Sequence, residues 1–409
     1  MLDTLRRWRP GGYLRASGSL LFWLVLRAAF QAGLVVLLAR QLGAAGYGEF
    51  VAGLGIAAMF VPLAGLGLHA AILRAGAARP EQLPLLFGAA LQACAGSIVV
   101  FGSLAVVAGW WVIGTAGFSL ALASLILAEI ASSTLVELVA RVSQARNRVA
   151  LYGGLQAGVS VVRLAGLGLA MPLFALDAER WMWIYAAVSL AYASALLAWY
   201  RSDYQLAAPA AVRRELLGQG RPFLLGALSS RIQADFNKPI LATVNFGSVG
   251  TFSAAQRIVD VASLPLIALQ EALWPRLFAQ SAQPSTMLAT STLLLLTAGA
   301  LGLSLHLIAP LVPQLLGRDF AESTDLLRML AWLPILQTVR NLGNARLILH
   351  SRTRWLSASY IVGASSSILL TLTLARLDGA RGVVVAAYGS EIAVIVLLAI
   401  GYIRERRPD

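Results

Sequence analysis

The sequence of 409 residues contains few of the side chains that commonly carry enzyme chemistry. It has one cysteine, Cys94, and three histidines, His69, His306 and His350, which stand far apart in the chain. A single cysteine excludes an internal disulfide and a cysteine metal cluster, and the isolated histidines lack the spacing of metal ligands. The sequence also lacks a P-loop and a dinucleotide-binding fingerprint. We therefore expect no bound metal and no cofactor.

Charged residues are also scarce. They make up 12% of the chain and apolar residues 58%, against about 25% and about 45–50% in average globular domains, and the mean hydropathy is +0.75. Lipid is therefore the expected solvent for most of the surface. The formal net charge is nevertheless +13, carried by arginines apart from Lys238. The high apolar fraction excludes a large, water-filled basic groove as the main feature, and we expect no nucleic-acid partner.

Long apolar runs divide the chain into twelve predicted transmembrane helices, since one span needs about 20 mainly apolar residues. The first run follows arginines at positions 6, 7, 9 and 15 and could be mistaken for a signal peptide. It is too long for one, Arg27 interrupts it, and no small-residue cleavage site follows, so we interpret it as the first span. The predicted spans are 17–38, 49–73, 84–108, 113–138, 150–174, 181–200, 222–243, 251–275, 287–312, 324–348, 355–375 and 382–403.

The distribution of arginine predicts the orientation. If both termini are cytoplasmic, 19 arginines fall in cytoplasmic segments and five in outer loops, namely Arg40, Arg180, Arg318, Arg376 and Arg381. This bias follows the positive-inside rule, and one missed helix would scramble it. We therefore expect a multi-pass protein with both termini in the cytoplasm. The outer loops are all short, which leaves no extramembrane domain for a conventional active site.

The second half of the chain repeats features of the first. The Gly-x-x-Gly segments at 43–46 and 247–250 align at an offset of 204, which also relates Arg27 to Arg231 and Gln31 to Asp235. The sequence thus predicts an all-α membrane protein of two pseudosymmetric six-helix lobes around a central cavity. The predicted parts are an N-terminal lobe (1–200), a cytoplasmic linker (201–220) and a C-terminal lobe (221–409). Repeats of this kind place a substrate site between the lobes near the membrane midplane.

Four arginines are predicted to lie deep in the membrane: Arg27, Arg231, Arg163 and Arg340. A cation at the centre of a membrane helix costs about 2.5–3.5 kcal/mol and normally faces a partner or a wet cavity. Arginine pairs bidentately with phosphate oxygens and stays charged in a low dielectric, so one hypothesis is a cationic cavity that binds a phosphorylated substrate. The alternative is structural pairing, with the predicted pairs Arg231–Asp235 and Arg257–Asp260, and with Glu129 or Glu391 as partners of Arg163 or Arg340.

Two further sets of residues carry hypotheses about movement and coupling. Asp235, Glu391 and Asp260, with Gln31 at the repeat-related position of Asp235, are candidates for ion coupling or for counter-ions to the arginines. Pro62 and Pro265, in the second helix of each lobe, remove backbone hydrogen bonds and are candidate hinges for rocking of the lobes. Static shaping of the cavity is the alternative for both prolines.

The run from Leu38 to Arg74, with its segment ARQLGAAGYGEF, resembles the opening of the polysaccharide (Wzx-type) flippases. These belong to the multidrug/oligosaccharidyl-lipid/polysaccharide exporter superfamily. Arg221-Pro222, Asp235, the segment FSAAQR at 252–257 and LWPR at 273–276 extend the resemblance through the second half. The resemblance implies a twelve-helix, two-lobe fold around a central cavity. The related lipid II flippases typically have two more C-terminal helices, and this sequence ends after the twelfth.

The resemblance also implies a function. The expected activity is translocation of undecaprenyl-pyrophosphate-linked oligosaccharides across the bacterial inner membrane by alternating access, for synthesis of surface polysaccharide such as O-antigen, capsule or exopolysaccharide. Expected partners are the lipid-linked glycan, membrane lipids, and polysaccharide polymerase and chain-length proteins. The alternatives are a cation-coupled multidrug exporter of the same superfamily, a non-transporting membrane scaffold, and a glycan polymerase or ligase. We do not expect an enzyme, because a polymerase or ligase usually needs a substantial outer loop.

Overall fold

The computed structural model describes residues 10–115, 117–206, 208–278, 284–349 and 352–405, and these residues form helices and turns with no strand among them. The helices of the first half are α2 (Pro10–Gly65), α3 (Leu68–Ala78), α4 (Leu83–Ile113), α5 (Leu120–Ala145), α6 (Val149–Ala170) and α7 (Ala178–Trp199). Those of the second half are α8 (Ala210–Asp235), α9 (Asn237–Ala242), α10 (Phe246–Ala262), α11 (Leu264–Phe278), α12 (Pro284–Ile308), α13 (Val312–Leu316), α14 (Glu322–Leu330), α15 (Leu333–Leu349) and α16 (Thr353–Glu405). Short 3-10 turns lie at Pro80–Gln82, Arg201–Asp203, Ala309–Leu311 and Arg318–Phe320.

The predicted twelve spans correspond to helices of the structure. Eight segments among the described residues are long and apolar enough to cross a membrane, and two of them are 57 and 50 residues long. These two bend sharply, α2 at Gly43 (φ 66°) and α16 at Asp378 and Gly379, so each holds two spans. The remaining two spans are formed by α8 with α9 and by α14 with α15. They are not among the eight segments because each is divided into two helices or carries several charges. The fold is therefore an all-α bundle of twelve spans.

The structure differs from the predicted boundaries at α8. This helix begins at Ala210, twelve residues before the predicted span at 222, and Pro209 precedes its first turn. The second half of the predicted linker is thus helical. Its residues, AAVRRELLGQG, include several good helix formers, and helix propensity does not depend on hydropathy, which was the property used to place the boundary. The division of the chain into lobes at 201–220 stays a prediction.

The predicted span 49–73 is interrupted between α2 and α3. Leu66 and Gly67 have φ values of 52° and 70°, in the left-handed region that glycine favours. A Cβ atom on Gly67 would lie 2.1 Å from the backbone oxygen of Gly220, so the chain needs glycine at this crossing with α8. The break therefore follows from a tertiary contact that the local sequence does not reveal.

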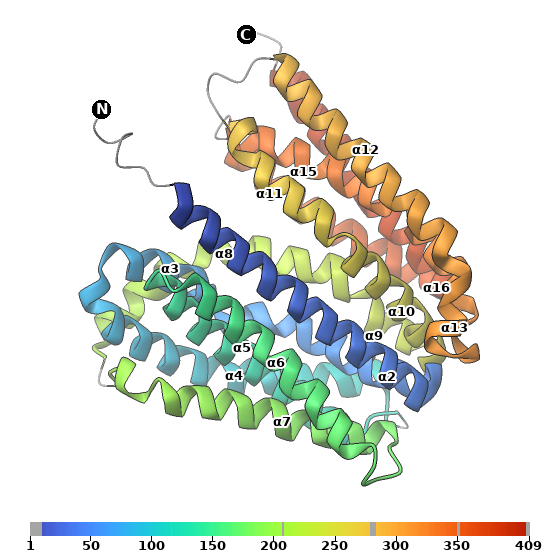
Figure 1. The fold of residues 1–409 in the computed structure, drawn as a ribbon, viewed down its shortest axis with the longest axis horizontal. Helices are drawn as coiled ribbons and strands as arrows, with labels where there is room; N and C mark the ends of the chain where they lie inside the picture. The colour runs from blue at the N-terminus through green and yellow to red at the C-terminus, as the bar shows by residue number, and fades with distance from the viewer. Residues whose placement is uncertain (1–9, 116, 207, 279–283, 350–351, 406–409) are drawn as a thin grey trace.

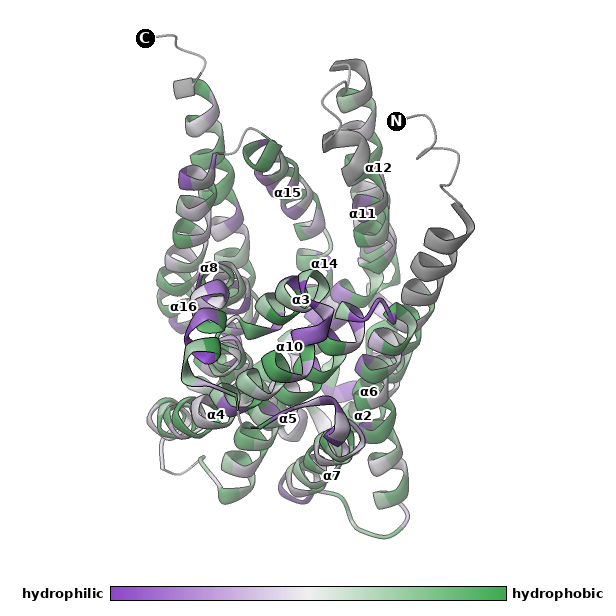
Figure 2. Cartoon of the chain, turned by 90° about the vertical axis from the view of Figure 1, so that its left-hand side faces the viewer, coloured by the Kyte–Doolittle hydropathy of each residue, from purple (hydrophilic) through white to green (hydrophobic). Residues whose placement is uncertain are grey.

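The start of α2 and the end of α16 lie at the same end of the molecule (Figure 1), and α13 lies at the opposite end. We call these the terminal end and the α13 end. In Figure 2 the pair α15 and α16 and the pair α11 and α12 stand as separate arms toward the terminal end. Large apolar side chains are exposed on the outside of the bundle, for example Trp111, Leu120 and Leu377, each 79–80% exposed. A soluble monomer rarely exposes so many, and a lipid-facing surface does.

The two halves of the chain meet along α2 and α10 at the α13 end. Tyr47 and Phe50 of α2 and Val249 and Phe252 of α10 are all buried in one hydrophobic cluster. A Cβ atom on Gly48 would lie 1.7 Å from the backbone oxygen of Phe246, and one on Gly250 would lie 2.0 Å from that of Ala44. The helices thus pack backbone against backbone through one glycine from each half. We call Gly48 and Gly250 with these contacts the glycine seam.

Candidate functional site

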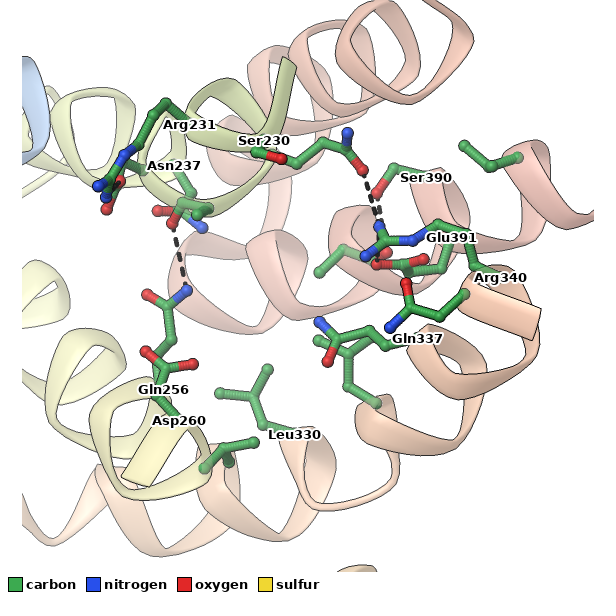
Figure 3. A pocket seen from close by; sticks show the side chains of 18 of the residues that line it. Ser230, Arg231, Asn237, Gln256, Asp260, Leu330, Gln337, Arg340, Ser390 and Glu391 are labelled. Carbon is green, nitrogen blue, oxygen red and sulfur yellow. Dashed lines mark hydrogen bonds and ion pairs between the residues drawn. The ribbon is translucent and has the colours of Figure 1, made fainter. Parts of the chain in front are cut away.

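A cavity of about 640 Å³ lies within the second half of the chain, between α8, α9, α10, α14, α15 and α16 (Figure 3). Polar or charged residues make up 17 of the 26 that line it. Six of the residues singled out from the sequence are among them: Arg231, Asp235, Arg257, Asp260, Arg340 and Glu391. The volume falls in the range of about 300–1,000 Å³ that small-molecule sites occupy.

Arg340 of α15 and Glu391 of α16 form an ion pair on the cavity wall. The distance from Arg340 Nη1 to Glu391 Oε1 is 2.7 Å, and the two side chains are 22% and 6% exposed. Arg340 also donates to Gln233 Oε1 of α8 at 3.1 Å. Figure 3 shows Arg340 and Glu391 side by side. Among the described residues, the second carboxylate oxygen, Glu391 Oε2, has no hydrogen-bond partner although it is buried. The pairing of Arg340 with Glu391 is one of the alternatives that the sequence left open.

Asp235 ends α8 and binds two cations. Its carboxylate lies 3.5 Å from Arg231 Nη1, one helical turn earlier, and accepts a hydrogen bond from Lys238 Nζ, three residues later. Asp235 is buried, whereas the Arg231 side chain is 53% exposed. This buried carboxylate is thus neutralised locally, and the more exposed Arg231 guanidinium remains accessible from the cavity. Sequence reasoning paired Arg231 with Asp235 and expected an interface anchor or a local ion pair for Lys238, without naming Asp235 as its partner.

In the first half, Arg163 of α6 is fully engaged by its neighbours. It forms an ion pair with Glu129 at 2.6 Å, donates to Ser189 Oγ at 3.0 Å, and stacks over the Tyr185 ring at 4.3 Å. Tyr185 in turn donates its hydroxyl to Glu129 at 2.7 Å. The Arg163 side chain is only 13% exposed. This geometry is that of a structural charge pair, and Arg163 does not line the cavity described above.

Arg27 of α2 lies in a second polar network of the first half. It donates to Gln156 Oε1 of α6 at 3.2 Å, Gln156 donates to Glu137, and Glu137 pairs with Arg141 at 2.6 Å. The partner of Arg27 is therefore an amide, and no carboxylate of the described residues forms a direct ion pair with it. The charge of Glu137 acts on Arg27 most strongly, followed by those of Arg257 and Arg163.

Arg257 of α10 and Gln31 of α2 join the two halves near this network. Arg257 Nη2 donates to Gln31 Oε1, across 226 residues of sequence. The sequence instead paired Arg257 with Asp260. The arginine of the second half whose charge acts on Arg27 is Arg257, whereas the repeat relates Arg27 to Arg231. The repeat could not reveal this, because its offset relates equivalent positions and does not say which of them meet.

Asp260 lines the cavity from α10, and Figure 3 shows it beside Gln256. The charges of Lys238 and Arg257 both act on it. Four cations (Arg231, Lys238, Arg257 and Arg340) and three carboxylates (Asp235, Asp260 and Glu391) therefore line the cavity, which gives it a formal net charge of +1. No group of three or more His, Cys, Asp and Glu side chains in the described ranges could hold a metal ion.

The two prolines have different local settings. Pro62 lies inside α2, four residues before that helix is interrupted at Leu66, whereas Pro265 is the second residue of α11, directly after the break from α10. Proline is well tolerated at a helix start because its missing N–H has no partner there. The hinge role of both residues stays a prediction.

Sequence reasoning missed the amide side chains of the cavity. Gln337, Asn341 and Asn344 of α15 all line it, and Gln233, Asn237 and Gln256 face them from α8, α9 and α10. The first three are spaced i, i+4 and i+7, which places them on one face of a helix. This spacing is readable in the sequence and could have identified the site, because an apolar span seldom carries three amides on one face.

No family model matches the sequence, and no curated protein matches it either. Among solved structures, the Lipid II flippase MurJ in an inward closed conformation has a TM-score of 0.76 at 12% identity, over 95% of this chain and 87% of that one. A multidrug resistance MATE family transporter of the MOP superfamily, in an inward-facing conformation, has a TM-score of 0.70 at 15% identity, over 92% and 94%.

A third similar structure is a MOP superfamily transporter from Pyrococcus furiosus described as having a binding pocket of reverse polarity, with a TM-score of 0.62 at 14% identity over 96% and 94% of the two chains. Together these structures define the fold class: the chain has the twelve-helix, two-lobe fold of MOP superfamily transporters. At 12–15% identity, they bear on the fold and leave the substrate open.

Proposed function

We propose that this protein is a flippase that moves undecaprenyl-pyrophosphate-linked oligosaccharides across the bacterial inner membrane. The observation that carries the proposal is the polar cavity with its excess of cations. Guanidinium groups bind phosphate oxygens bidentately, and Arg231 presents such a group with half of its side chain exposed. A pocket with net positive charge suits a phosphorylated, hydroxyl-rich molecule and repels the cations that multidrug exporters often carry.

The glycine seam supports alternating access as the mechanism. It holds α2 and α10 together at the α13 end. Arg40 adds a second link between the halves there, because its guanidinium donates to the backbone oxygens of Gln314 and Leu315 at 3.0 and 2.7 Å. In the proposed mechanism these contacts separate when a substrate leaves at that end, and the arrangement with the seam intact would be one of the two alternating states.

The cellular setting belongs to the same proposal. The termini would be cytoplasmic, and the protein would act beside a polysaccharide polymerase and chain-length partners in making surface polysaccharide. It would act as a transporter and would catalyse no covalent step.

The test is deletion and complementation in the bacterium of origin. We expect the deletion to abolish surface polysaccharide and to accumulate the lipid-linked glycan, with unchanged drug susceptibility. Arg27→Ala and Arg231→Ala should insert normally in the membrane yet fail to restore polysaccharide. Arg180→Ala, whose side chain is 56% exposed and pairs with Asp177, is the matched control and should restore it. Full complementation by both test variants would contradict the proposal.

A cation-coupled multidrug exporter is the second candidate. Glu391 favours it, because a buried carboxylate with one unpartnered oxygen can bind a proton or a cation. A deletion strain that becomes sensitive to cationic drugs and keeps its surface polysaccharide would select this alternative.

A further inference from the structure

We propose that the amide side chains of the cavity form a saccharide subsite that binds the hydroxyl groups of the transported glycan. This inference rests on the proposed function and adds where the sugar lies. The subsite consists of Gln337 and Asn344 of α15, Gln233 of α8, Asn237 of α9 and Gln256 of α10. It lies within the second half of the chain, apart from the contact between Arg257 and Gln31 that joins the halves.

Amide groups match the chemistry of a sugar. Each amide carries two N–H donors and one carbonyl acceptor on a planar head, and each sugar hydroxyl both donates and accepts. A cluster of amides can therefore satisfy adjacent hydroxyls without any net charge. Phe252 and Tyr360 are the aromatic residues of the lining, and most of the other lining residues are polar or charged. The wall therefore offers mainly hydrogen-bonding groups, whereas a planar, largely apolar cation would need apolar and aromatic surface.

Unsatisfied acceptors in the cavity wall point to a ligand. Asn237 is 6% exposed, and within the described part of the chain its Oδ1 has no hydrogen-bond partner. Gln256 Oε1 is also buried and without a partner in that part of the chain, and the amide nitrogen of Gln256 donates to the backbone oxygen of Ala234 at 3.2 Å. Buried acceptors are normally paired, and leaving one unpaired destabilises the protein. Bound hydroxyl groups would supply the missing donors.

The position of the subsite implies separate binding sites for the pyrophosphate and the sugars of the substrate. Arg231 and Arg257 line the same cavity as the amides, and Arg257 reaches α2 of the other half through Gln31. The pyrophosphate would therefore lie toward the contact between the halves, on the arginines, and the sugars would extend into the cavity toward α15 and α16. A carrier lipid without a glycan should leave the amide subsite unused.

Binding of two lipids to the purified full chain tests this division. The probes are synthetic undecaprenyl pyrophosphate and the lipid-linked glycan fraction extracted from the deletion strain, and the readout is native mass spectrometry of the detergent-solubilised protein. We expect Gln256→Met and Asn344→Leu each to weaken binding of the glycosylated lipid by about tenfold, the effect of losing one or two hydrogen bonds. Binding of undecaprenyl pyrophosphate should change less than about twofold by the same reasoning.

The variants are chosen to fold. Gln256→Met removes an oxygen that has no partner among the described residues and one hydrogen bond, from the amide nitrogen to the backbone oxygen of Ala234. Asn344→Leu removes the acceptor of a 3.3 Å hydrogen bond from the Ser359 hydroxyl, which still donates to the backbone oxygen of Leu356 at 2.8 Å. Gln205→Met, at an exposed amide outside the cavity, is the matched control, and the unfolding temperature of each variant is measured in parallel. Equal losses for both lipids, or no loss for either, would overturn the subsite. If the deletion strain accumulates no lipid-linked glycan, the proposed function itself fails.

Discussion

Arg340 and Glu391 form an ion pair 2.7 Å long on the wall of the cavity, and this pair engages only one of the two carboxylate oxygens. The pair joins α15 to α16, and Gln233 of α8 accepts a second hydrogen bond from the same guanidinium at 3.1 Å. One arginine thus links three helices around the cavity. A substrate phosphate or a proton on Glu391 would compete with this arrangement.

Removal of the guanidinium alone should destabilise the protein. Arg340→Met leaves a buried carboxylate without its counter-charge, and breaking a buried pair in this way costs about 3–5 kcal/mol. The double variant Arg340→Met with Glu391→Gln should recover most of the loss, because the remaining groups are then neutral. Thermal unfolding of the detergent-solubilised variants measures both effects, and a double variant no more stable than Arg340→Met would contradict the pairing.

Arg163 should behave differently from the cavity arginines. Glu129, Ser189 and Tyr185 occupy its guanidinium, so we expect Arg163→Met to lower the unfolding temperature and to leave substrate affinity unchanged. The comparison is Arg231→Ala, which we expect to weaken binding of undecaprenyl pyrophosphate with little effect on stability, because its side chain is 53% exposed. Reversed outcomes for the two variants would show that the sites have been assigned to the wrong arginines.

The sequence was sufficient for the number and class of the helices but not for their ends. Hydropathy separates the spans on either side of Gly43, and those on either side of Asp378 and Gly379, because glycine or charge interrupts the apolar runs there. Hydropathy predicts the start of α8 at 222, because the arginines in the first turns of this helix lower the local hydropathy to that of a linker. The break at Gly67 depends on contact with Gly220, which local sequence does not contain.

The site was only partly predictable for the same reason. The ionic partners of Arg163 and Arg340 are 34 and 51 residues away in the sequence, so the pattern of charges gave the possible pairs without selecting among them. Lys238 is three residues from Asp235, and that pair could have been read from helical spacing. The contact of Arg257 with Gln31 spans 226 residues and requires the packing of the two halves.

The orientation in the membrane can be measured with two exposed positions. In a Cys94→Ser background, Gln314→Cys at the α13 end should react in intact cells with a membrane-impermeant maleimide. Glu81→Cys, in the 3-10 turn before α4, should react only after the membrane is permeabilised. The expectation follows from the arginine bias of the predicted cytoplasmic segments. Labelling in the opposite order would place the termini outside.

The glycine seam should control opening at the α13 end. A Cβ atom on Gly48 would lie 1.7 Å from the backbone oxygen of Phe246, and backbone cannot yield as a flexible side chain would, so Gly48→Ala must push α2 and α10 apart. We expect a cysteine at Val249, which is fully buried in α10, to become reactive toward an impermeant maleimide in this variant when Cys94 is replaced by Ser.

The control for the seam is Gly96→Ala in α4, where a Cβ atom would meet nothing within 4 Å. Both changes add one methyl group to a helical glycine, so they share any effect on helix propensity, which favours alanine by about 1 kcal/mol. Only the change in the seam should expose the cysteine at Val249 to the maleimide. Equal labelling of the two variants would mean that the halves separate elsewhere and that the glycines serve only close packing.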